Sequence, residues 1–227
     1  MKLEDLTWKE VGDYLKKKDS LIIPIGTCEQ HGKHLPLNTD TYVTEKIADF
    51  LSEQTGILVA PTINYGVNFW VDKDKSGTAN VDGDILTEYM ASILEWWKLQ
   101  GFKNFFALSA HGEPKHLEAI KKSDSNVKLI SLYDLNIKDI LEKQGGVYHA
   151  CEGETSVMLY LMPESVQMDK AKDLDIDSDE LEDYVKNPKT KGNYDGPVGF
   201  PTFATKEKGE KIFDSMKKNA LSWIESE

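Results

Sequence analysis

Short apolar runs that alternate with helical patterns constrain the fold of this chain more than any other feature. The apolar runs cover residues 21–26, 57–63, 105–109 and 127–132. The helical patterns cover residues 6–17, 41–54, 84–100, 114–123, 154–162 and 205–225. Strands that alternate with helices form mainly parallel sheets, and continuously apolar strands are covered by helices on both faces. The pattern therefore predicts an α/β fold built on a mainly parallel sheet.

The sequence indicates a single domain spanning residues 1–227. Its length is enough for one sizeable core, and it contains no repeats, no low-complexity tract and no Ser/Gly linker. Residues 1–18 mix charged and apolar side chains and lack the apolar core of a signal peptide. No apolar run reaches the length of about 18 residues that a membrane span needs. We therefore expect a cytoplasmic protein with no membrane partner.

The charge of the chain limits the partners that it can bind. Its formal net charge is −12, and a nucleic-acid interface needs a basic patch, so we expect no nucleic-acid partner. All 27 basic residues are lysines. Without arginine, no bidentate guanidinium group can hold a carboxylate or a phosphate. An anionic part of a substrate would have to be held by lysine, backbone amides or metal.

The five histidines are confined to three short segments that are rich in carboxylates. These segments are Glu29-x-His31-x-x-His34 with Asp40 behind it, His111-x-Glu113-x-x-His116, and His149-Ala-Cys-Glu-x-Glu154. A single histidine on an apolar face is usually a buried core residue, but this clustering favours metal binding. Carboxylate and imidazole ligands suit Zn, Mn or Fe(II).

The first two of these segments directly follow predicted strands. The carboxyl ends of parallel strands meet at one edge of a sheet, where α/β proteins form their sites. Five or six ligands exceed the needs of one four-coordinate zinc ion, whereas two ions that share a bridging carboxylate would use them all. The segments therefore predict two divalent metal ions, Zn, Mn or both, with Fe(II) as an alternative, holding a hydroxide between them.

The same segments resemble the creatininase family of amidohydrolases. Residues 24–40, PIGTCEQHGKHLPLNTD, are similar to the family's P-x-G-S-x-E-Q-H-G-P-H-L-P-L-x-T-D, with Thr27 replacing Ser and Lys33 replacing Pro. Residues 109–112 stand where many members have N-G-H-G, and residues 149–156 are similar to H-A-G-x-x-E-T-S. Shorter elements extend the resemblance over nearly the whole chain, at residues 65–66, 76–78, 199–201 and 204–209.

The resemblance implies a layered α/β/α domain with a binuclear metal site. Members typically hydrolyse amide C–N bonds in small, often cyclic substrates, and many form hexamers, so we expect a small-molecule amide substrate and a homo-oligomer. Carried over by position, the metal ligands would be Glu29, His31, Asp40 and His111, with Asp40 bridging the two ions. A metal-bridging hydroxide would then attack the substrate carbonyl carbon.

One further carboxylate ligand is left open by the resemblance. Glu113 lies two residues after a histidine, as in creatininases proper, whereas Glu154 matches the Glu of H-A-G-x-x-E-T-S. His149 or Glu154 would protonate the leaving nitrogen. His34 is expected to orient the loop or a ligand.

Two other functions remain as alternatives. One is a deformylase that acts on a formamidopyrimidine nucleotide in flavin or deazaflavin biosynthesis, a hypothesis weakened by the lack of arginine for the phosphate. The other is a non-catalytic metal-binding protein, which would have a closed coordination shell, because catalysis needs an open position.

Three features outside these segments have their own predictions. Trp96 and Trp97 lie in a helix at core-facing spacing, and we expect both to pack in the core. Phe69 and Trp70 lie in a loop and would line either a substrate pocket or a subunit contact. The acidic stretch 173–183 is expected to be a solvated surface segment.

Overall fold

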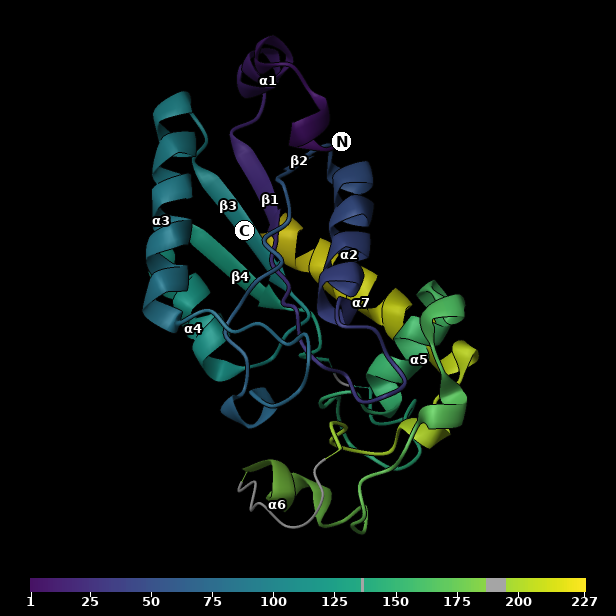
Figure 1. Ribbon diagram of the computed structural model, residues 1–227. Coiled ribbons are helices and arrows are strands. Elements are labelled where there is room, and N and C mark those ends of the chain that lie inside the picture. Colours follow the sequence, from purple (N-terminus) through teal and green to yellow (C-terminus); the bar gives the residue numbers. More distant parts are fainter. Residues whose placement is uncertain (136, 187–194) are drawn as a thin grey trace.

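A four-stranded parallel sheet forms the centre of the molecule. The computed structural model describes residues 1–135, 137–186 and 195–227. The strands are β1 (Ser20–Pro24), β2 (Leu58–Val59), β3 (Asn104–Ser109) and β4 (Val127–Ser131), in the order β2-β1-β3-β4 (Figure 1). Every neighbouring pair is parallel, which confirms the predicted sheet.

Helices occupy the six predicted intervals, with ends that differ by a few residues, and a further helix, α6, forms where none was predicted. The α-helices are α1 (Trp8–Leu15), α2 (Thr39–Thr55), α3 (Gly83–Gln100), α4 (Pro114–Ser123), α5 (Glu152–Leu161), α6 (Leu181–Lys186) and α7 (Lys206–Ser226). Short 3-10 helices are η1 (Leu3–Asp5), η2 (Trp70–Asp72), η3 (Pro163–Ser165), η4 (Met168–Lys170) and η5 (Pro201–Phe203). No described helix combines the length and apolar character needed to cross a membrane.

The helices cover both faces of the sheet and make three layers. Leu21 and Phe105 point to one face, where they pack with residues of α1, α3 and α4. Ile22 and Phe106 alternate to the other face, where they pack with residues of α2, α5 and α7 (Figure 1). Side chains alternate along a strand, so strands covered on both faces must be apolar throughout. The predicted α/β/α fold is therefore confirmed.

The prediction that both tryptophans of α3 pack in the core is wrong for one of them. Trp97 packs against the core, whereas Trp96 is 66% exposed. The buried stripe of α3 consists of Leu86, Met90 and Leu94. At 100° per residue, position 97 returns to this stripe and position 96 is turned about 100° away from it.

The acidic stretch 173–183 is only partly a solvated surface. Its last residues begin α6, and Leu181 there is 1% exposed. Burial of Leu181 removes apolar surface from water, while the neighbouring exposed carboxylates stay in water.

Candidate metal centre and its cavity

The ends of two strands and the first turns of two helices bring the candidate ligands together. Glu29 and His31 follow β1, and His111 follows β3, as the sheet-edge argument predicts. Asp40 lies in the first turn of α2, and Glu154 lies in the first turn of α5. Both carboxylates therefore sit at helix N-termini, whose positive dipole ends stabilise negative charge.

Two local backbone features make this approach possible. A Cβ on Gly26 would lie 2.3 Å from the Oγ1 of Thr41, so only glycine lets the first turn of α2 rest on the end of β1 and bring Asp40 in. Ala150 adopts a left-handed conformation with φ 49°, which is costly for a residue with a Cβ. This turn directly precedes α5 and sets the position of His149.

The ligand atoms form two groups that share one carboxylate. In the first group, the Nδ1 of His111 lies 3.1 Å from Oε2 of Glu29 and 3.2 Å from Oδ2 of Asp40. In the second group, the Nε2 of His31 lies 3.3 Å from Oδ1 of Asp40 and 3.8 Å from Oε2 of Glu154. Within each group all ligand atoms lie within 4.8 Å of one another. Asp40 turns one oxygen to each group, which is the arrangement that a bridging carboxylate requires.

Backbone carbonyls orient both imidazoles of these groups. The Nε2 of His111 lies 2.8 Å from the carbonyl oxygen of Val67, and the Nδ1 of His31 lies 3.1 Å from the carbonyl oxygen of Glu29. A carbonyl accepts only from N–H, so the opposite nitrogen of each neutral ring presents its lone pair to the cluster. Metal-binding histidines are typically held in this way.

The donor set fits divalent cations. All four carboxylate oxygens of Glu29 and Asp40 are buried, and none accepts a hydrogen bond within the described part of the chain. The imidazole nitrogens of His31 and His111 lie near these oxygens but do not have hydrogen-bond geometry. This is the arrangement expected of atoms that would ligate a common metal ion. Buried carboxylates without partners cost free energy, and a cation in each group would offset that cost.

Without metal, the cluster holds protons in place of cations. Burial opposes charge on His31, but the carboxylates of Asp40 and Glu154 outweigh it and raise its pKa to about 10. Burial likewise opposes charge on His111, but the carboxylates of Glu29 and Asp40 raise its pKa well above its usual value. Burial also acts to raise the pKa values of Glu29 and Asp40, but the facing imidazoles lower both. Burial raises the pKa of Glu154 to about 8.

The structure places the two competing glutamates differently. Glu113 lines the cavity beside the cluster, but it caps α4: its Oε2 accepts the backbone N–H of His116 at 2.7 Å. It belongs to neither of these two groups, nor to the third candidate group found among the described residues, which consists of Glu29, His31 and His149. Glu154 belongs to the second group and accepts the backbone N–H of Ala150. The geometry therefore favours Glu154 as the remaining ligand.

His149 lies against the cluster on the side of Glu29. Its Nδ1 is 3.8 Å from Oε2 of Glu29, and its ring centroid is 4.5 Å from that of His31. Burial, partly opposed by the Glu29 carboxylate, lowers the pKa of His149 to about 4. His149 is therefore neutral at neutral pH.

Gln30, to which the sequence pattern assigned no role, sets the tautomer of His149. Its Nε2 lies 2.9 Å from Oδ1 of Asp72 and 2.9 Å from Nε2 of His149, while its Oε1 accepts the backbone N–H of Gly32. The carboxylate and the N–H together fix the orientation of the amide. Nε2 of His149 is then an acceptor, so the proton is on Nδ1 and faces the cluster.

The other two histidines are buried outside the ligand groups. His34 Nε2 lies 2.9 Å from the hydroxyl of Thr155. His116 accepts the backbone N–H of Val67 at its Nδ1, and its Nε2 lies 3.3 Å from the hydroxyl of Ser109. Burial lowers the pKa of His34 to about 4 and that of His116 to about 3. Both are neutral hydrogen-bonding groups that position neighbouring segments.

A cavity of about 710 Å³ opens over the cluster. The cluster side contributes Asp40, His111, His149 and Glu154. The apolar and aromatic wall residues are Phe69, Trp70, Val71, Tyr133, Val147, Tyr148, Tyr184, Val185 and Val198. Phe69 and Trp70 thus line the cavity, which is one of the two predicted roles. This volume and lining are typical of a site for a small organic molecule.

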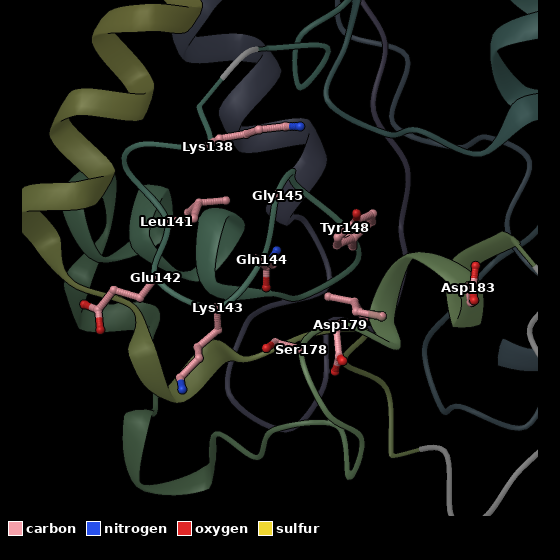
Figure 2. A pocket seen from close by; sticks show the side chains of 11 residues that line it. Lys138, Leu141, Glu142, Lys143, Gln144, Gly145, Tyr148, Ser178, Asp179 and Asp183 are labelled. Atoms are coloured by element: carbon pink, nitrogen blue, oxygen red, sulfur yellow. The ribbon is translucent and has the colours of Figure 1, made fainter.

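A second hollow of about 420 Å³ lies between the loop before α5 and the start of α6. Figure 2 shows its charged lining, with Lys138, Lys143, Asp179 and Asp183 around it. Tyr148 lines both spaces. None of the residues in the ligand groups lines this hollow, so the chemistry belongs to the larger cavity.

An α/β/α domain with carboxylate–imidazole groups at the sheet edge, open to a cavity, defines an α/β protein with a candidate metal centre. Comparison with known proteins refines this class. The sequence model of the creatininase family, described as creatinine amidohydrolase, matches residues 4–224. The chain therefore belongs to the creatininase family.

Curated relatives carry several activities. The creatinine amidohydrolase of Pseudomonas putida is 26% identical over 92% of this chain and 90% of its own length. The mycofactocin precursor peptide peptidase of Mycobacterium ulcerans is 28% identical over 90% of this chain and 84% of its own. The 3-dehydro-scyllo-inosose hydrolase of Thermotoga maritima is 28% identical over 75% of this chain, which spans 59% of that protein.

Solved structures agree with the fold. A manganese creatininase superposes with a TM-score of 0.82 at 23% identity, covering 99% of this chain and 97% of its own. A creatininase variant of the Zn–Zn type superposes with a TM-score of 0.80 at 22% identity, covering 99% and 96%. At this level of identity the similarity supports the three-layer architecture.

Proposed function

We propose that this chain is a metal-dependent amidohydrolase that cleaves a C–N bond in a small molecule. The observation that carries the proposal is Asp40, which turns one oxygen to each of two ligand groups while both oxygens lack hydrogen bonds among the described residues. Relatives named as an amidohydrolase and a peptidase, which both act on amide bonds, support it. The open cavity beside the cluster favours catalysis over a closed, purely metal-binding role.

Each ligand group would hold one divalent ion. Glu29, Asp40 and His111 would bind the first, and His31, Asp40 and Glu154 the second. When bound, such a pair supplies a Lewis acid for the substrate carbonyl and makes hydroxide available near neutral pH.

Two side chains beside the ions would handle protons and substrate. His149 presents its Nδ1–H to the cluster. The amide N–H of Gln30 donates to Nε2 of His149, which disfavours protonation of that nitrogen. His149 therefore acts as a neutral hydrogen-bond donor to the substrate. Glu154, ionised once metal is bound, uses its second oxygen to accept the proton of the attacking water and pass it to the leaving nitrogen.

The cavity suggests the kind of amide. Its apolar and aromatic walls fit a planar or apolar body, and its volume of about 710 Å³ exceeds what a ring as small as creatinine would fill. Lys73 and Lys75 also line it, with Asp74 between them. Because these lysines can attract an anionic group, a formylated aminopyrimidine nucleotide is the second candidate substrate.

Assembly into a homo-oligomer is part of the proposal. Ile85, Tyr89, Trp96 and Leu99 are all more than half exposed on α3. At 100° per residue they form one stripe about 80° wide on the helix surface. Such a stripe fits a contact between copies of the chain. Light scattering coupled to size-exclusion chromatography, on the wild type and on Trp96→Glu, would test it.

The test of the activity is turnover by protein stripped of metal and reloaded with Zn, Mn or Fe(II). The panel contains creatinine, other cyclic amides, formylated aminopyrimidines and short peptides. We expect metal-dependent hydrolysis of one class, lost in Asp40→Asn and kept in Asp49→Asn, whose surface carboxylate lies 3.9 Å from Lys2. Tightly bound metal without turnover of any amide would refute the hydrolase and favour a metal-binding protein.

Metal content distinguishes the two glutamates. We expect Glu154→Gln to lose one of two ions per chain, and Glu113→Gln to keep both, as measured by elemental analysis after dialysis. The opposite pattern would reassign the second site to Glu113.

A further inference from the structure

Tyr133 lies at the same sheet edge as the metal ligands. It belongs to the turn that directly follows β4. The backbone N–H of Leu132 donates to the carbonyl oxygen of Ser109 at 2.8 Å, which ties this turn to the end of β3, two residues before His111. The side chain of Tyr133 lines the large cavity together with Asp40, His111 and Glu154.

The phenol group of Tyr133 is buried without a partner. Its hydroxyl oxygen is closed to solvent and makes no hydrogen bond within the described part of the chain. A buried hydroxyl without a partner is destabilising, and most buried polar side-chain atoms in native proteins have a hydrogen-bond partner. Burial and the negative charge of Glu154 and Asp40 raise the pKa of Tyr133 well above its usual value. The group therefore keeps its proton and remains a donor.

We propose that Tyr133 is a catalytic residue whose O–H donates a hydrogen bond to the substrate carbonyl oxygen as hydrolysis turns it into an oxyanion. The inference rests on the proposed amide hydrolysis. In that reaction the oxygen of water bonds to the carbonyl carbon, the C–N bond breaks, and a proton from water goes to the nitrogen. Tyr133 keeps its own proton throughout. A donor already in place lowers the barrier because its hydrogen bond strengthens as charge develops.

The decisive variant is Tyr133→Phe, which removes only the hydroxyl. We expect kcat to fall about 100-fold, as for the loss of one oxyanion donor, with KM and metal content unchanged. The melting temperature should stay equal or rise, because the phenylalanine leaves no unsatisfied hydroxyl. The matched control is Tyr14→Phe: its hydroxyl donates to the carbonyl oxygen of Ser20 at 2.6 Å, at the far end of β1, so it should melt lower with unchanged kcat.

Each outcome decides the role of Tyr133. Unchanged kcat in Tyr133→Phe, or a fall in kcat accompanied by loss of metal, overturns the proposal. If the wild type hydrolyses no amide, the proposed function fails. The donor role of Tyr133 is then tested by calorimetric titration of the metal-loaded protein with methylphosphonate, a small tetrahedral oxyanion. Binding at least tenfold weaker in Tyr133→Phe supports the donor role, whereas equal binding, or none to the wild type, refutes it.

Discussion

Adding Zn²⁺ to the metal-free protein at pH 7 should displace about three protons per chain from the ligand side chains, in addition to the proton that a metal-bound water loses when it becomes hydroxide. Ligands must give up their protons to bind metal, and three groups of the cluster hold one. The pKa of His31 is about 10 and that of His111 is well above its usual value, so both are protonated at pH 7. Glu154, with a pKa of about 8, is mostly protonated. His149, with a pKa of about 4, contributes none.

The sign and the pH range of the effect follow from these values. Because protons compete with metal below each pKa, affinity for metal must rise with pH. For the ligand side chains alone, the logarithm of the constant for binding both ions should climb about three units per pH unit near pH 7, and less steeply at higher pH, once Glu154 has ionised. Titration calorimetry in two buffers of different ionisation enthalpy counts the protons directly.

Glu154→Gln provides the internal control for the proton count. It removes the second ion site, so only the proton of His111 should be displaced, about one per chain. Release of one proton or fewer by the wild type would refute the proposed ligand set, because a group that keeps its proton cannot ligate the metal.

Three further substitutions test how the fold supports the site. His116→Ala should weaken metal binding about 10- to 100-fold in chelator competition, because His116 holds the backbone segment that orients His111. Lys208→Met should lower the free energy of unfolding in urea by about 3–5 kcal/mol, because it leaves the fully buried Glu152, 2.7 Å away, without its counter-ion. Gly209→Ala should cost at least 1–3 kcal/mol in the same assay, because the new Cβ would lie 1.9 Å from a carbonyl oxygen of α5.

Controls for these variants come from the surface. Lys122→Met breaks an exposed ion pair with Glu118 at 2.6 Å and should leave the urea midpoint nearly unchanged, because water screens the pair. Gly12→Ala in α1 meets no atom within 4 Å and should stabilise the protein by up to about 1 kcal/mol. A Lys208→Met variant as stable as Lys122→Met would show that the buried pair contributes nothing.

Local chemistry was predictable from the sequence because it acts between neighbours in the chain. Thr7 and Glu10 form a capping box at the start of α1, a pairing whose two partners lie within one helical turn. The strands were found because burial on both faces demands continuous apolar runs. Glu29, His31 and His111 were placed at one sheet edge because parallel strands all end there. Tyr133 also follows a predicted strand, the fourth, so the rule that parallel strands end at one sheet edge places it there too. A single tyrosine is not part of a metal-ligand pattern, however, so the sequence pattern offers no reason to select it.

Only the tertiary structure distinguished between residues that the sequence pattern treats alike. Glu113 and Glu154 both follow histidines in ligand-like segments, yet one caps a helix and the other faces His31. Trp96 and Trp97 are adjacent, yet one is exposed, because the sheet covers a single face of α3. A sequence states which groups a segment carries, whereas the direction in which each group points depends on packing against segments far away in the chain. Metal sites and cavities depend on how side chains from distant segments are oriented, so they cannot be read from one segment of the sequence.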